Sequence, residues 1–207
     1  PKHYKSMKKL IPLLLVVLTF AACEKDPDTD KLDNKYLVYT NYDTKADFKA
    51  FQTYYMPDSI LIIGDKKEAE YWKDESAQEI LQAYATNMNN RGFVRVDDRE
   101  EANLGLQVSY IKSTYYFNDY PGYWDAPYWG NWGGWYYPYA VTYTYSTGSF
   151  ITELLNLEAT QGEKEKLPIL WTSYMSGLLS GSTAVNTKLA IEGVNQAYTQ
   201  SSYLTNK

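Results

Sequence analysis

The sequence predicts an α+β domain, with an antiparallel or mixed β-sheet of about six to seven strands and two main helices packed on one face. Short runs of β-branched and aromatic residues, typical of strands, recur from residue 36 onward. Two longer stretches, 65–93 and 183–204, place apolar residues three and four positions apart, which is typical of amphipathic helices. Because the strands come in runs, the helices are expected to cover one face of the sheet.

The first helix is predicted to follow two strands, at residues 36–42 and 51–56. The sequence Asn-Asn-Arg-Gly at 89–92 supplies the signal that ends this helix. The apolar positions that predict its buried face are Ala77, Ile80, Leu81, Tyr84 and Met88.

Two further strands, at 93–97 and 104–111, are predicted on either side of a charged turn. The second strand alternates apolar residues with small or polar ones, which predicts a half-buried strand with one face wet or covered by a helix. Its apolar positions are Leu104, Leu106, Val108 and Tyr110, and the intervening ones are Gly105, Gln107 and Ser109.

The second half of the chain predicts a hairpin, one more strand and a closing helix. The hairpin covers residues 140–158, and Gly148 supplies the positive φ that its turn at 146–149 needs. A strand follows at 166–177. Thr183 is the predicted N-cap of the closing helix, whose apolar positions are Val185, Leu189, Val194 and Tyr198.

The N-terminal segment has the pattern of a secretory signal. We expect residues 1–6 to be an upstream remnant and Met7 to be the start, followed by two lysines and an apolar run at 10–20. These eleven residues are too few to span a membrane core, which needs about 20 residues in a helix. The sequence therefore predicts that residues 1–22 are a signal peptide that is removed.

Cys23 gives this signal a more specific form. Residues 20–23, Phe-Ala-Ala-Cys, resemble the bacterial lipobox, in which the cysteine is acylated and becomes the mature N-terminus. Residues 23–35 are then a lipidated N-terminus and a flexible acidic tether, similar to the acidic stretches of surface-exported Bacteroidetes lipoproteins. The expected location is the outer membrane, on its periplasmic or surface side. The alternative is an ordinary signal peptide followed by a free cysteine.

The charge of the predicted mature chain argues against nucleic acid as a partner. Removal of residues 1–22 removes four of the 20 basic side chains, which leaves 16 against 25 acidic ones and a net charge of −9. Binding to nucleic acid depends on neutralising phosphates, and binding flat on anionic lipid also needs basic residues. The membrane is therefore expected to be a partner through the N-terminal lipid alone.

The same mature chain lacks the residues that most enzymes use. Its single histidine, His3, is removed with the signal, and its only cysteine would be acylated. This excludes catalysis by Ser-His-Asp or Cys-His and zinc sites built on His or Cys. The acidic run at 97–101 lacks the spacing of a calcium loop and is expected to be a solvated turn. We expect no enzyme, no cofactor and no metal.

Several blocks of the sequence resemble one family. They are "ADFKAFQTYYM" at 46–56, "NNRGFVRVDDREEANLGLQVSY" at 89–110, a Tyr/Trp/Gly-rich insert, and "LPILWTSYMSG" at 167–177. Together they resemble the domain-of-unknown-function family 4136, over residues 36 to about 205. The resemblance implies a bacterial envelope lipoprotein with an α+β fold and without an established activity. It implies no catalytic residues.

An aromatic-rich insertion at about 116–140, within the single domain 36–207, is the candidate functional feature. Residues 110–145 hold 16 aromatic side chains but only three charged ones. Proline and glycine interrupt any regular strand from 118 to 139, which predicts a long loop. The candidate ligand- or partner-binding residues are Tyr123, Trp124, Tyr128, Trp129, Trp132, Trp135, Asp119 and Asp125.

Four roles for this loop are consistent with the sequence. Its rings could pack on the domain's own sheet. They could stack on the faces of sugars, with nearby Asp and Asn side chains binding hydroxyls. They could form a protein-binding patch or insert into a membrane interface. Asp119 and Asp125 also resemble the carboxylate pair of a glycosidase, although the sequence does not hold them at a set separation.

The sequence as a whole predicts a lipid-anchored cell-envelope protein. We interpret it as a non-catalytic binding or assembly module that uses its aromatic loop toward envelope polysaccharide or another envelope protein. The alternative is a purely structural or assembly lipoprotein whose aromatic loop packs on its own sheet. A carboxylate-dependent glycan hydrolase is the third hypothesis.

Overall fold

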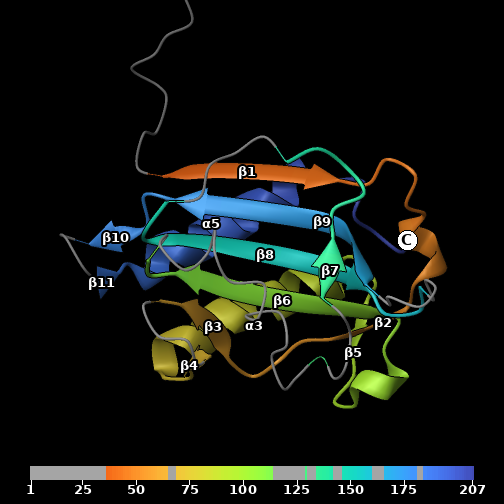
Figure 1. Ribbon diagram of the computed structural model, residues 1–207, viewed down its shortest axis with the longest axis horizontal. Helices are drawn as coiled ribbons and strands as arrows, with labels where there is room; N and C mark the ends of the chain where they lie inside the picture. The colour runs from red at the N-terminus through yellow and green to blue at the C-terminus, as the bar shows by residue number, and fades with distance from the viewer. Residues whose placement is uncertain are drawn as a thin grey trace, which may run out of the picture. The chain divides into compact units, whose positions relative to one another are not determined.

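The computed structural model describes residues 36–64, 69–113, 129, 134–141, 146–159, 166–180 and 184–207. These residues all belong to one unit that spans residues 34–207. Within it, a mixed sheet carries two helices on one side, so the predicted α+β class is confirmed (Figure 1).

Four long strands form the antiparallel part of the sheet, with β1 at its edge. They lie side by side in the order β1-β9-β8-β6, and each neighbouring pair is antiparallel (Figure 1). Their length follows from their sequences, which are rich in β-branched and aromatic residues. The bounds are β1 Leu37–Tyr42, β6 Leu104–Ile111, β8 Ser149–Asn156 and β9 Leu167–Ser176.

Short strands extend this sheet and make it mixed. β2 and β3 both pair in parallel with one edge of β6, β5 pairs in parallel with β2, and β7 pairs in parallel with β9. β4 pairs with β3, and β10 and β11 form a separate hairpin. The bounds are β2 Thr53–Tyr55, β3 Ile60–Ile63, β4 Glu70–Trp72, β5 Val94–Arg95, β7 Trp135–Tyr136, β10 Leu179–Ser180 and β11 Ala184–Val185.

The described residues thus build a nine-stranded sheet, where about six to seven strands were predicted. β3, β4 and β7 were missed because two to four residues are too few to show a period of two. The predicted turn glycine is confirmed, since Gly148 has φ of +80°. The first arm of the predicted hairpin falls largely on residues 142–145, which lie outside the described residues.

Both main helices begin at a side-chain cap. α3 (Glu75–Asn90) starts after Asp74, whose carboxylate accepts from the Ala77 N–H at 3.0 Å. α5 (Thr187–Gln200) starts after Asn186, which accepts from the Leu189 N–H at 3.1 Å. The predicted cap, Thr183, is therefore wrong. Neither of these helices is long and apolar enough to cross a membrane, nor is any other helix in the described part of the chain.

The core lies between the helices and one face of the sheet. The five residues predicted for the buried side of α3 are all buried there. They pack against Leu104, Leu106 and Val108 of β6 and against aromatic residues of β8 and β9. Several polar groups in this layer are paired: the hydroxyls of Tyr84 and Thr152 lie 2.6 Å apart, and the Trp171 indole donates to Ser201 Oγ at 2.8 Å.

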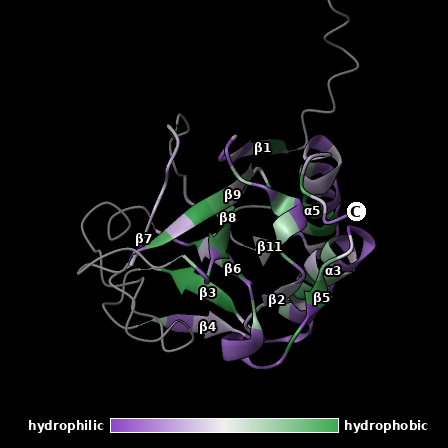
Figure 2. Cartoon of the chain, turned by 90° about the vertical axis from the view of Figure 1, so that its right-hand side faces the viewer, coloured by the Kyte–Doolittle hydropathy of each residue, from purple (hydrophilic) through white to green (hydrophobic). Residues whose placement is uncertain are grey.

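The opposite face of the sheet is also covered, so the prediction of a half-buried β6 with a wet or helix-covered face is wrong. Gly105, Gln107 and Ser109 point away from the helices and are nevertheless buried. Figure 2 shows β7 on the side of the sheet opposite α3 and α5. A second, smaller cluster lies there, built by Trp129, Leu155, Leu167 and Ile169 with aromatic residues around them.

Arg91 joins the end of α3 to the end of α5. Its Nη1 donates to the carbonyl oxygens of Ser201, at 2.9 Å, and Leu204, at 3.0 Å, and its Nη2 donates to the carbonyl of Tyr198. The guanidinium carbon also lies 5.5 Å from the centre of the Tyr198 ring. A single cation therefore binds three carbonyl groups at and just beyond the end of α5, two of which also accept from backbone N–H groups.

Replacing Arg91 with Ala is expected to lower the free energy of unfolding by about 2 to 3 kcal/mol, because charge-assisted hydrogen bonds to partly buried carbonyls are lost. Urea denaturation followed by circular dichroism measures this change. Arg99→Ala is the matched control, since Arg99 pairs at the surface with Glu100, and its effect should stay within about 0.5 kcal/mol. Equal effects of the two substitutions would contradict a stabilising role for the hydrogen bonds of Arg91.

Candidate functional site

The structure describes two of the residues predicted for the aromatic site, Trp129 and Trp135. Both lie on the face of the sheet opposite the helices, which we call the far face. The other candidates lie outside the described residues: Tyr123, Trp124, Tyr128, Trp132, Asp119 and Asp125, and the predicted lipid attachment residue Cys23.

Trp129 is packed inside the protein, with no exposed surface. Its ring lies directly over Gly105, and its indole N–H donates to Gln107 Oε1 at 2.7 Å. Tyr55 and Trp135 meet it edge to face, with ring centroids 5.7 and 6.5 Å away. A buried ring has no free face for a sugar or partner to stack on, so for Trp129 the geometry favours packing on the domain's own sheet.

The segment 134–141 continues this cover across the far face. Gly134 accepts a hydrogen bond from the Leu167 N–H of β9 at 3.0 Å, and the Ala140 carbonyl accepts from Asn41 Nδ2 of β1 at 2.9 Å. Between these two points, Trp135, Tyr137 and Tyr139 pack against the far-face cluster. The segment is therefore a short bridge that is tied to the sheet at both ends.

Glu153 lies beneath the middle of this bridge and was missed by the sequence analysis. It occupies the inner part of β8, is fully buried, and accepts a hydrogen bond at Oε1 from the Tyr137 hydroxyl. Burial raises the pKa of this carboxyl to about 7, although hydrogen bonds from Tyr137 and Trp135 act in the opposite direction. The one available signal was a single acid inside an otherwise apolar strand, "SFITELLN".

The outer side of the same bridge borders a groove. Because side chains alternate along an extended chain, Tyr136 and Pro138 point away from Trp135 and Tyr137. They line a groove of about 360 Å³ together with the loop 43–51 and the facing ends of β8 and β9. Its walls also include Asp43, Lys45, Ala46, Asp47, Ala50, Phe51, Asn156, Ala159, Pro168 and Leu170.

The groove combines apolar surface with several polar side chains. Two carboxylates, Asp43 and Asp47, each accept a hydrogen bond from a backbone N–H two residues later, which holds the loop in shape. Lys45 and Asn156 add an ammonium donor and an amide. In the part of the chain that the structure describes, no group of three or more His, Cys, Asp or Glu side chains could hold a metal ion.

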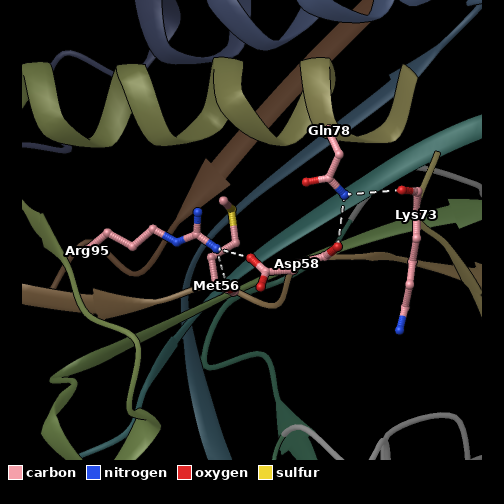
Figure 3. A network of polar contacts seen from close by, with 5 residues as sticks. All are labelled: Met56, Asp58, Lys73, Gln78 and Arg95. Atoms are coloured by element: carbon pink, nitrogen blue, oxygen red, sulfur yellow. Dashed lines mark hydrogen bonds and ion pairs between the residues drawn. The ribbon is translucent and has the colours of Figure 1, made fainter. Parts of the chain in front are cut away.

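Two other polar clusters serve the fold. Figure 3 shows Arg95 reaching Asp58 at 2.7 Å and the Met56 carbonyl at 2.8 Å, while Gln78 donates to the Asp58 carbonyl at 3.0 Å. These contacts connect β5 and α3 to the turn before β3. The acidic run at 97–101 forms a short 3₁₀ turn, Arg99–Glu101, capped by Asp98.

An α+β domain whose sheet carries helices on one face and an aromatic bridge on the other is the class of protein that the structure defines. The family model "Domain of unknown function (DUF4136)" matches residues 38–201. The chain belongs to this family.

A solved structure shows the same likeness. The chain is similar to the crystal structure of a DUF4136 family protein from Bacteroides thetaiotaomicron, with 58% identity, a TM-score of 0.75, and coverage of 84% of this chain and 100% of that one. A PelC dodecamer from Paraburkholderia phytofirmans matches at 10% identity and a TM-score of 0.39, over 83% of this chain and 99% of that one. No curated protein matches.

Replacing Gly105 with Ala tests the packing of the Trp129 ring on the backbone of residue 105. The added methyl group would lie 2.6 Å from Cη2 of the indole, a rigid and fully enclosed ring, so we expect a loss of about 1 to 3 kcal/mol in the free energy of unfolding. Thermal and urea denaturation measure it. Gly64→Ala is the control, because among the described residues its methyl group would meet no atom nearer than 3.6 Å. A Gly105→Ala protein as stable as this control would contradict the packing.

Proposed function

We propose that this protein is a lipid-anchored component of the cell envelope that acts as a non-catalytic binding or assembly module. Its aromatic segment would engage an envelope polysaccharide or another envelope protein, with the polysaccharide as the first candidate. One observation carries this proposal: the bridge that covers the far face on its inner side lines an open groove on its outer side.

The composition of the groove supports a carbohydrate ligand. Binding sites for small ligands are concave, range from about 300 to 1,000 Å³, and place a few polar groups around apolar surface. Tyr136 and Pro138 offer apolar surface to the C–H face of a sugar ring, and Asp43, Asp47 and Asn156 can bind hydroxyl groups. Lys45 can donate to a hydroxyl or a carboxylate, so the groove also suits an acidic sugar.

A structural role is the second candidate function. The complete burial of Trp129 and its hydrogen bond to Gln107 favour it, because this ring contributes to stability rather than to a surface. In that case the aromatic segment completes the fold, and partners would dock elsewhere on the domain.

Substitution in the groove is expected to weaken glycan binding without unfolding the domain. Tyr136→Ala removes the apolar platform and Lys45→Ala removes a donor, and each should weaken binding at least tenfold. Purified envelope polysaccharides on an array, followed by calorimetry with oligosaccharides from those that bind, provide the measurement. Lys49→Ala is the control, because Lys49 is exposed on the same loop but does not line the groove.

Two results would argue for the structural role instead. One is the absence of binding by the wild-type chain to any polysaccharide on the array. The other is binding that Tyr136→Ala and Lys45→Ala leave unchanged.

The proposed anchor depends on Cys23. Metabolic labelling of expressing bacteria with an alkyne-tagged fatty acid is expected to mark the wild-type chain and to leave Cys23→Ser unmarked, because the serine variant lacks the thiol that is acylated. In membrane fractionation, the Cys23→Ser variant should appear in the soluble fraction instead of the membrane fraction. Label that persists in Cys23→Ser would rule out the lipobox.

A further inference from the structure

Glu153 sits where a carboxylate is hard to accommodate. β8 is an inner strand, flanked by β6 and β9, and the Glu153 side chain has no exposed surface. Its Oε1 accepts from the Tyr137 hydroxyl, and the Trp135 indole also favours the ionised form, but Oε2 makes no well-formed hydrogen bond among the described residues. An ionised carboxylate in such a place loses its hydration, and the protein supplies few hydrogen bonds to replace the lost water.

The described groups around Glu153 carry no compensating charge. Its cross-strand neighbours are Gln107 on β6 and Thr172 on β9. Gln107 is occupied by Trp129 and by the Val108 carbonyl, and Thr172 donates to the Thr152 carbonyl. Among the described residues, the titratable groups on the facing elements are phenols: Tyr137 and Tyr139 on the bridge, and Tyr174 on β9, whose hydroxyl bonds Ser146 and Ser149. No lysine or arginine among the described residues lowers the pKa of Glu153.

Of the described elements around this carboxyl, the bridge is held by the fewest strand pairings. β6 and β9 each pair with β8 along most of their length, but β7 pairs with β9 at only two positions, Trp135 with Leu167 and Tyr136 with Pro168. If Glu153 loses its proton, water can reach it at least cost by displacement of the bridge. The same residues, 135–138, carry one wall of the groove on their outer side.

We propose that protonated Glu153 is a positioning residue for the groove: the neutral carboxyl tolerates burial under the bridge, and loss of its proton, which creates a charge that needs water, releases the wall formed by Tyr136 and Pro138. Glu153 does not touch the groove itself, and it acts through the bridge. This inference rests on the proposed function, since it adds control by pH to the same binding groove.

The direction of this control follows from linkage. The pKa of Glu153 is about 7 under the bridge, against an ordinary value of 4.5, so the covered form binds the proton more tightly than an uncovered form. Below pH 4.5 both forms are protonated, and the covered form has its full stability. As the pH rises to about 7 this advantage is lost, and above that both forms are ionised. The ratio of uncovered to covered forms should therefore rise on the order of 100-fold across this window.

Hydrogen exchange of the amides of residues 134–141 tests the inference without any ligand. The full-length wild type and Glu153→Gln are compared at the same pH, which cancels the intrinsic effect of pH on exchange. At pH 5 we expect similar protection, since both side chains are neutral. At pH 8 the wild type should exchange at least tenfold faster than the variant. Glu79→Gln, an exposed residue of α3, is the matched control and should follow the wild type.

Tyr137→Phe separates a positioning role from simple packing. The ring remains, but the donor that favours the carboxylate is removed, so the midpoint of the exchange transition should move to higher pH. Equal exchange of wild type and Glu153→Gln at pH 8, or a midpoint that Tyr137→Phe leaves unchanged, would overturn the inference.

The two proposals fail in different ways. Exchange that depends on pH through Glu153, in a chain that binds none of the polysaccharides on the array, supports the positioning role and removes the proposed function. Binding that requires Tyr136 but shows no dependence on Glu153 or on pH from 5 to 8 keeps the proposed function and overturns the inference.

Discussion

The seat of Trp129 over Gly105 is the contact on which the far face depends. A side chain on residue 105 would occupy the space of the indole, so only glycine lets the ring reach the strand. Burying a tryptophan removes roughly 200 Å² from water, which stabilises the fold by on the order of 5 kcal/mol. The indole N–H also satisfies Gln107, whose amide would otherwise be buried without this partner. One residue therefore both excludes water and pairs a polar group of the central strand.

The covered far face makes the structure and the candidate site interdependent. Polar residues of the three middle strands, Gln107 and Glu153 among them, lie under aromatic rings instead of solvent. Within this bridge, Tyr136 of β7 lies between the inward side chains of Trp135 and Tyr137 and points outward, and Pro138 lines the groove beside it. A segment that closes the sheet on one side thus becomes the wall of a groove on the other. For this reason substitutions on the inner side of the bridge can alter the groove without touching it.

Helices and strands that are long enough to repeat their apolar period could be predicted from the sequence. The apolar positions of α3, from Ala77 to Met88, recur over several turns, and the middle strands are long enough to stand out. β4, at 70–72, lies in a stretch that was assigned to the first helix, because pairing with β3 outweighs local preference there. Thr183 and Asn186 are both good caps by composition, and only the start of α5 at Thr187 distinguishes them.

The sequence by itself determined the α+β class, the two helices, the middle strands and the family, because each of these depends on patterns within one segment. The site depended on pairs of residues that are distant in the chain. Trp129 meets Gln107 across 22 positions, and Tyr137 meets Glu153 across 16. A strand with a period of two can turn either set of side chains toward a cover, so the burial of Glu153 and the inward direction of Trp129 were decided only when the aromatic bridge folded across the sheet.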